Sequence, residues 1–154
     1  MSLFACQDHN NCTLTQITDQ IFIGTHLPGK HHWEALVSMG FAADIDLEFE
    51  QTERPKGLEI FLWLPTKDFH APTLTQLLTG AHLLKDLVEQ KKKVYIHCRL
   101  GHSRSPTLVA AYFILMGDSP REAFQKIKAK RPQAHLEIVQ EEALEEFAHN
   151  LKKG

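Results

Sequence analysis

Hydrophobic residues along this chain fall into short apolar runs and into longer stretches with helical spacing. The short runs have the length and the β-branched and aromatic content of buried strands, and they cover residues 20–24, 41–47, 58–64 and 94–97. The longer stretches predict helices over residues 31–39, 73–90, 103–116, 119–130 and 136–151. Strands therefore alternate with helices in the first part of the chain, and helices dominate the second part.

The helical stretches carry recognisable start signals and apolar faces. Thr73 with Gln76, and Ser119 with Glu122, have the spacing of a capping box at a helix start. The stretch 103–116 is apolar on all sides, which predicts a buried central helix. The helix 73–90 should direct one face into the core, namely Leu74, Leu77, Leu78, Ala81, Leu84 and Val88. The last helix should do the same with Val139, Ala143, Leu144, Phe147 and Leu151.

This order of elements predicts an α/β fold with one domain. We expect a small, mostly parallel but mixed sheet over residues 14–154, flanked by helices on both faces. Residues 1–13 show no such pattern and are expected to form a flexible N-terminal segment. Trp33 and Trp63 are expected to pack in the core or beneath loops.

Composition narrows the class of protein. The chain has 154 residues, 43% hydrophobic and 23% charged, with a net charge of −2. Such a balance gives no basic face, so neither nucleic acid nor a membrane is expected as a partner. The longest apolar run, 108–116, is too short to cross a bilayer, and we expect no signal peptide. We expect a monomer.

The cysteines give an expectation about location and metals. Three cysteines are an odd count, which favours a reducing cytoplasm over a disulfide framework. Cys6, His9 and Cys12 lie close together, but they lack a fourth ligand with finger-like spacing. We therefore expect neither a metal nor another cofactor.

The most informative segment is YIHCRLGHSRSPT, residues 95–107. A short strand leads into a loop that holds Cys98, and an apolar helix follows at Arg104. The backbone N–H groups of such a loop, with the positive end of the helix, form an anion-binding nest. The same donors stabilise a thiolate, so the pKa of Cys98 should fall below that of a free cysteine. The loop residues expected to bind phosphate are Arg99, Leu100, Gly101, His102, Ser103 and Arg104.

Side chains around the cysteine have separate expected roles. Arg104 can hold two phosphate oxygens in a planar fork. Gly101 allows positive φ or a close backbone approach. Ser105 can donate a hydrogen bond to the sulfur of Cys98, and His97 is expected to orient the loop. The alternative is a buried free cysteine on a core strand, with an unrelated surface arginine.

HCRLGHSRS resembles the H-C-x-x-G-x-x-R-[ST] signature of the cysteine-dependent protein tyrosine phosphatase superfamily. The short chain and its Ser-Arg-Ser-Pro sequence resemble the compact dual-specificity branch. The resemblance covers roughly residues 21–147, although only the loop is highly specific. It implies a phosphatase-type fold, a cysteinyl-phosphate intermediate on Cys98, no metal, and a separate loop that carries an acidic aspartate.

A general acid must protonate the leaving oxygen in such a reaction. Five aspartates were compared as candidates, namely Asp44, Asp46, Asp68, Asp86 and Asp118. Asp68 fits best, because it follows a buried strand in a loop between Pro65 and Pro72. This loop resembles the family's P-D-F-like acid loop, with Lys67 in place of the proline. Asp46 is the reserve candidate.

Three further residues have weaker assignments. Gln140 follows Arg131-Pro132 and resembles a late element of the family whose glutamine positions the attacking water. A surface glutamine on a helix fits the sequence almost equally well. His102 could supply positive charge near the phosphate at mildly acid pH. His70 is expected to be a solvated loop residue.

The function predicted from these residues is phosphomonoester hydrolysis without a metal. The expected substrates are phosphotyrosine proteins, with phosphoserine and phosphothreonine proteins as further substrates. The alternatives are a phosphate-binding pseudophosphatase, or the same chemistry on a phosphoinositide or an RNA 5′ end. A rhodanese-type sulfurtransferase also uses a loop cysteine, but it does not need Ser105 or Asp68.

Overall fold

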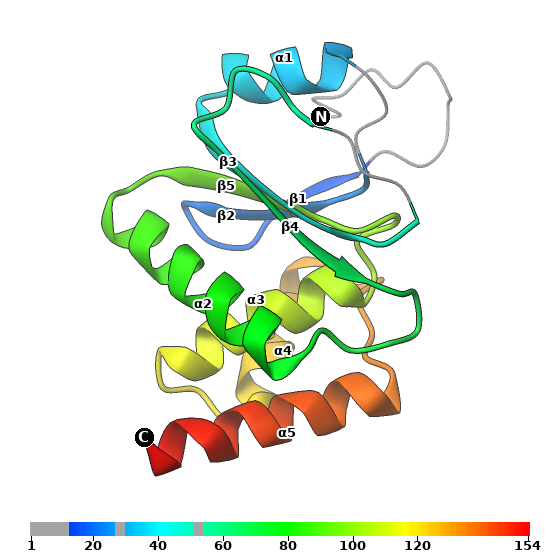
Figure 1. The fold of residues 1–154 in the computed structure, drawn as a ribbon, viewed down its shortest axis with the longest axis vertical. Helices are drawn as coiled ribbons and strands as arrows, with labels where there is room; N and C mark the ends of the chain where they lie inside the picture. The colour runs from blue at the N-terminus through cyan, green and yellow to red at the C-terminus, as the bar shows by residue number, and fades with distance from the viewer. Residues whose placement is uncertain (1–12, 27–29, 51–53) are drawn as a thin grey trace.

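The structure is a computed structural model, which describes residues 13–26, 30–50 and 54–154. Cys6, His9 and Cys12 lie outside the described residues, as does the predicted flexible segment except for Thr13. Within the described residues, a mixed sheet lies between one helix on its upper face and four on its lower face (Figure 1). This arrangement confirms the predicted α/β class and the position of helices on both faces.

The sheet has five strands in the order β1-β2-β5-β3-β4. They are β1 (Leu14–Gln16), β2 (Ile21–Gly24), β3 (Phe41–Glu48), β4 (Ile60–Thr66) and β5 (Lys93–His97). β1 pairs antiparallel with β2, and all other pairs are parallel. Because β5 is the central strand, the loop that follows it lies at the middle of the sheet, at the carboxyl ends of the parallel strands.

The helices match the predicted positions within two residues. They are α1 (Lys30–Ser38), α2 (Leu74–Glu89), α3 (Arg104–Leu115), α4 (Pro120–Lys130) and α5 (Ile138–Lys153). Both predicted capping boxes are present: Thr73 caps α2 with Gln76, and Ser119 caps α4 with Glu122. These caps satisfy N–H groups that the first helical turn leaves without intrahelical partners.

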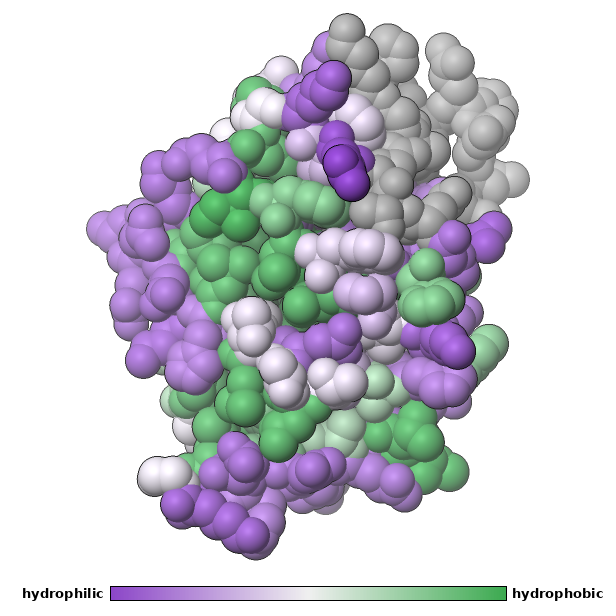
Figure 2. All heavy atoms as spheres, in the orientation of Figure 1, coloured by the Kyte–Doolittle hydropathy of each residue, from purple (hydrophilic) through white to green (hydrophobic). Residues whose placement is uncertain are grey.

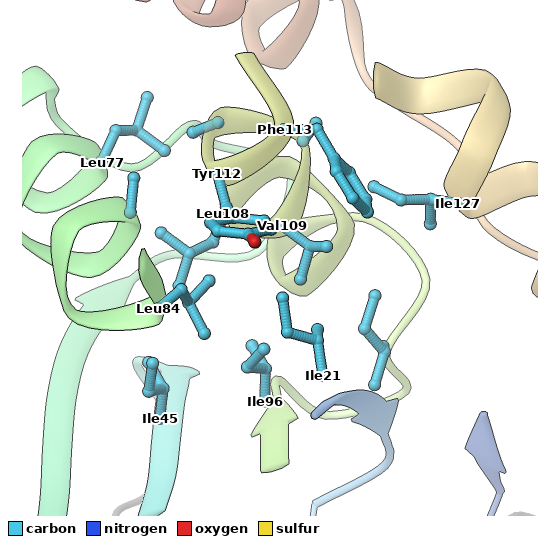
Figure 3. Close-up of a cluster of buried hydrophobic side chains, with 14 of the residues drawn as sticks. Ile21, Ile45, Leu77, Leu84, Ile96, Leu108, Val109, Tyr112, Phe113 and Ile127 are labelled. Carbon is cyan, nitrogen blue, oxygen red and sulfur yellow. The ribbon is translucent and has the colours of Figure 1, made fainter. Parts of the chain in front are cut away.

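The larger hydrophobic core lies between the sheet and the four lower helices. α3 is at its centre, and every residue of α3 from Arg104 to Ile114 is buried. Figure 3 shows Leu108 and Val109 of α3 facing Ile21 and Ile96 of the sheet, with α2 and α4 on either side. A smaller core beneath α1 contains Phe22, Leu36, Phe41 and Tyr95. Burial on all sides fixes α3, and therefore the loop at its start.

Figure 2 shows hydrophobic residues in the middle of the viewed face and hydrophilic residues along the lower edge, where α5 lies. No helix in the described part of the chain is long and apolar enough to span a membrane.

Four details differ from the sequence prediction. β1 was not predicted, because three residues are too few to show a period. The strand predicted to end at residue 64 continues through Pro65 to Thr66 in β4; β4 is an edge strand, where a missing N–H is tolerated. Val139 is 46% exposed and not in the core. Trp63 is 42% exposed on this edge strand, where its indole N–H donates to the carbonyl of Glu48 at 2.8 Å.

Candidate active site

The segment between β5 and α3 forms the base of a small pocket. Cys98 follows the last residue of β5 and is 3% exposed, and α3 begins at Arg104. Gly101 has φ of 69°, as the sequence predicted, and a Cβ there would lie 2.6 Å from the carbonyl oxygen of Gly24. The pocket, of about 120 Å³, is lined by Asp68, Phe69, Cys98, Arg99, Leu100, His102, Ser103, Arg104 and His135. Cys98, Arg104 and Asp68 therefore line one cavity, although Asp68 comes from a separate loop.

Arg104 is held by two residues, Glu50 and Thr66, that do not line the pocket. Its side chain is 2% exposed, and Nη1 donates to both carboxylate oxygens of Glu50, at 2.9 and 3.1 Å, and to the carbonyl of Thr66 at 2.8 Å. Its Nε has no hydrogen-bond partner among the described residues. Burial alone would raise the pKa of Glu50, but backbone hydrogen bonds and Arg104 lower it. One edge of the guanidinium is thus fixed, and Nε remains for an anion.

Asp68 lies on the loop after β4, with its side chain 49% exposed. Its Oδ1 is 3.7 Å from Nε of Arg104 and accepts the N–H of Phe69 at 3.0 Å. Phe69 adopts φ of 63°, a left-handed conformation that is uncommon for a residue with a side chain. This turn places the carboxylate at the pocket and leaves the Phe69 ring 68% exposed at its rim.

His97 is buried behind the reactive loop and contacts two carboxylates of β3. Its Nε2 is 3.1 and 3.2 Å from the two oxygens of Asp44, and its Nδ1 is 3.7 Å from Asp46. Burial lowers the pKa of His97, but the charges of Asp44 and Asp46 outweigh burial and raise it to about 9. Burial raises the pKa of Asp46 to about 6, against the effect of His97. Asp46 is 1% exposed within the sheet, a poor position for the general acid for which it was the reserve.

Gln140 connects the acid loop to the reactive loop. It is fully buried, which excludes the surface alternative. Its Nε2 donates to the carbonyl of His70 at 3.1 Å and to the hydroxyl of Ser103 at 3.4 Å. Its Oε1 accepts the N–H of Glu137, which fixes the side chain at the start of α5. A role in positioning water stays a prediction.

Two further assignments from the sequence do not match the geometry. Ser105 is fully buried, but its hydroxyl has no hydrogen-bond partner among the described residues. The predicted bond to the sulfur of Cys98 is therefore absent. Burial, with the nearby Arg131 and His135, lowers the pKa of His102, which opposes the positive charge that we expected there.

Arg131 is a site residue that the sequence indicated only through the Arg131-Pro132 pair before Gln140. It is fully buried at the end of α4. Its Nε donates to the carbonyl of Gly101 at 2.8 Å, and its Nη2 donates to that of Leu100 at 2.9 Å. It also donates to the hydroxyls of Thr13 and Thr15, at 2.8 and 2.7 Å. Arg131 thereby ties the carbonyls of the reactive loop to β1 and to the residue before it.

Two charged partners, Glu50 and Arg131, were thus missed. The residues that they contact lie far away in the sequence, so no local spacing indicated either one. The Arg131-Pro132 pair was the available signal for the second.

A thiol in the loop between a strand and a helix, a fixed arginine and an aspartate on a second loop are together typical of the cysteine-dependent phosphatases. Residues 27–150 match the family model for the dual specificity phosphatase catalytic domain. The chain belongs to the dual specificity phosphatase family.

Curated relatives are similar over part of this domain. The human phosphatidylglycerophosphatase and protein-tyrosine phosphatase 1 is 39% identical over 77 residues, which are 49% of this chain and 38% of that protein. Mouse laforin is 31% identical over 103 residues, which are 65% of this chain and 31% of laforin. The matched segments thus span 38% and 31% of these two relatives, which is less than half of either protein.

Solved structures match over most of the chain. The crystal structure of PTPMT1 has a TM-score of 0.80 and 30% sequence identity, and it covers 92% of this chain and 97% of that one. The crystal structure of PTPMT1 in complex with PI(5)P has a TM-score of 0.79 and 27% identity, over 91% of this chain and 97% of that one. These likenesses confirm the predicted phosphatase-type fold.

Proposed function

We propose that this protein is a phosphomonoester hydrolase that forms a cysteinyl-phosphate intermediate on Cys98 without a catalytic metal. The observation that carries the proposal is the shared pocket of Cys98, Arg104 and Asp68. The thiolate of Cys98 attacks phosphorus, the phosphorus–sulfur bond forms, and the bond to the leaving oxygen breaks. Asp68 gives its proton to that oxygen, then accepts a proton from the water that releases phosphate and restores the thiolate.

Charge in the transition state falls on the equatorial phosphate oxygens. The backbone N–H groups of residues 99–104 and the start of α3 are the donors that would bind these oxygens. Nε of the fixed Arg104, which has no hydrogen-bond partner among the described residues, adds a charged donor. Arg99 and Leu100 are exposed at the rim, so their backbone contributes more than their side chains.

For the substrate, we propose phosphotyrosine proteins, with phosphoserine and phosphothreonine proteins as further substrates. Phe69 is 68% exposed and Leu100 is 43% exposed at the rim, and both can contact an aromatic ring or a neighbouring peptide side chain. The expected cytoplasmic location and the monomeric state stay predictions.

A lipid phosphate is the second candidate substrate. The names of the relatives include a phosphatidylglycerophosphatase, and one matched structure holds PI(5)P. The same apolar rim could contact acyl chains near a phosphorylated headgroup. An RNA 5′ end fits less well, because among the described residues only Arg99, Arg104 and His102 add basic side chains from the loop itself.

The deciding experiment compares turnover on matched substrates in the presence of a chelator. We expect hydrolysis of an aryl phosphate that vanadate inhibits and that Cys98→Ser abolishes. A phosphotyrosine peptide, a phosphothreonine peptide and a soluble short-chain phosphoinositide then rank the substrate classes by kcat/KM. Full activity of Cys98→Ser would refute the mechanism. Phosphopeptide binding with no release from any substrate would support the pseudophosphatase alternative.

A further inference from the structure

A buried cluster of three potential metal ligands lies behind the reactive loop. Asp46 and Glu48 come from β3, and His97 comes from the adjacent β5. One ligand atom from each of the three lies within 4.8 Å of those of the other two. The residues are 1%, 2% and 5% exposed, respectively. Such burial sets this cluster apart from the exposed acidic groups that are common on protein surfaces.

The imidazole of His97 is oriented as in a metal ligand. Its Nε2 lies 3.1 and 3.2 Å from the two oxygens of Asp44, whereas Nδ1 has no hydrogen-bond partner among the described residues. Nδ1 faces Asp46, whose Oδ1 is 3.7 Å away. A histidine that binds a metal commonly donates its other ring N–H to a carboxylate, which fixes the tautomer. Asp44 occupies that position here.

The carboxylates of Asp46 and Glu48 provide the remaining oxygen ligands for a metal ion. Oε1 of Glu48 is buried without a hydrogen-bond partner among the described residues, and Oε2 is 3.8 Å from Nδ1 of His26. Oδ1 of Asp46 accepts the backbone N–H of Glu48 at 2.7 Å, which fixes the Asp46 carboxylate beside the start of the Glu48 side chain. Asp44, Asp46 and Glu48 place three carboxylates around one imidazole, and Arg104 is already paired with Glu50. A cation would therefore compensate a buried excess of acidic groups.

We propose that Asp46, Glu48 and Nδ1 of His97 form a Zn²⁺ site, with Asp44 as the positioning residue of the histidine. A mixed nitrogen and oxygen set suits zinc, whereas Mg²⁺ and Ca²⁺ take oxygen ligands. Ligand atoms around a tetrahedral zinc lie roughly 3.3 Å apart for bonds of about 2.0 Å. Small side-chain rotations would bring the cluster to that size. His26, whose Nδ1 is 3.8 Å from Oε2 of Glu48, is the candidate for a fourth ligand.

The site is separate from the proposed chemistry but adjacent to it. His97 directly precedes Cys98, so zinc would replace a proton with a doubly charged ion next to the reactive loop. The proposal does not rest on phosphatase activity, because the ligands and their positioning residue are all outside the pocket lining.

The test is zinc binding by this 154-residue chain with Cys6, Cys12 and Cys98 all changed to serine, so that no thiolate can bind the ion. Equilibrium dialysis and calorimetry should show one Zn²⁺ per chain, and Mg²⁺ should not compete. Glu48→Gln and Asp44→Asn in this background should each weaken zinc binding about 10- to 100-fold. Glu59→Gln is the matched control, because that side chain is 72% exposed and far from the cluster in the strand register, and it should leave affinity unchanged.

A second readout keeps the test independent of folding defects. The indole of Trp63 donates to the carbonyl of Glu48, so its fluorescence should change as zinc binds in a Trp33→Phe background. Circular dichroism must show that each variant keeps its helices. The proposal is overturned if the chain without cysteine binds no zinc, or if a folded Glu48→Gln variant binds it as tightly as the parent.

Discussion

At the scale of single residues, the site depends on how charged side chains are oriented. Arg104 uses Nη1 for Glu50 and Thr66 and leaves Nε for the pocket. The sequence identifies Arg104 from its spacing to Cys98, but it does not say which edge of the guanidinium faces the phosphate. Glu50 decides that, so it is a positioning residue in the proposed reaction.

Glu50→Gln should lower kcat/KM on an aryl phosphate by roughly tenfold, which corresponds to about 1.4 kcal/mol of transition-state stabilisation. The amide can accept one hydrogen bond from Arg104 but loses the charge. Steady-state kinetics with the exposed Glu59→Gln as control would measure this. An unchanged kcat/KM with an intact fold would show that Thr66 alone positions the arginine.

Asp68→Asn should lower kcat by 10²- to 10⁴-fold, because the amide cannot protonate the leaving oxygen. Binding of vanadate should persist, since Arg104 and the loop N–H groups remain. Substrates with better leaving groups should lose less activity, because they need less protonation. If the loss is the same for all leaving groups, Asp68 does not act as the acid.

At the scale of elements, the predicted pattern succeeds where residues act locally and fails where partners are distant. The strand before Cys98, the positive φ of Gly101 and both capping boxes follow from neighbouring residues, and the structure contains all of them. Arg131 could not be assigned from its surroundings, because its partners lie on β1 and on the loop after β5. Helical spacing predicted that Val139 would lie in the core, but in the folded chain no other element covers its side chain fully, and it is 46% exposed.

Arg131→Lys should lower both stability and activity. Lysine is a single point donor, so it cannot serve the carbonyls of Leu100 and Gly101 and the hydroxyls of Thr13 and Thr15 together. Buried groups that lose their partners cost about 1–3 kcal/mol each, so the free energy of unfolding should fall by at least 2 kcal/mol. Urea denaturation measures it, with the exposed Arg121→Lys on α4 as control. Equal losses in both variants would contradict an anchoring role.

At the scale of the whole molecule, the cluster behind the loop makes stability depend on pH. The pKa values of Asp46, Glu48 and His97 are raised, to about 6, about 7 and about 9, from ordinary values of 3.8, 4.5 and 6.5. For both carboxyls burial is the main cause, whereas for His97 burial acts against the rise and the nearby carboxylates outweigh it. Each group binds its proton more tightly in the folded state than in the unfolded state. Its contribution to the free energy of unfolding is therefore complete at low pH and is lost as pH rises.

Without zinc, the contribution of these groups to stability should therefore decline between about pH 4 and pH 9. The melting temperature of the double variant Asp46→Asn and Glu48→Gln should fall less over this range than that of the parent protein. Calorimetry at several pH values, with a chelator present, makes the comparison. A parallel pH dependence of both proteins would contradict these pKa shifts.

The central position of β5 has a consequence for the order in which the chain acquires its reactive thiol. β5 must pair with β2 and with β3, and its loop is then fixed by Arg131 and Gln140, which are synthesised later. Contacts between residues far apart in the sequence form late in folding, because closing the intervening loop costs entropy before the contacts stabilise the chain. During synthesis, the strands and α2 can assemble while the loop still lacks its anchors. A nascent chain that ends before α4 would thus carry the cysteine without the environment that makes it reactive.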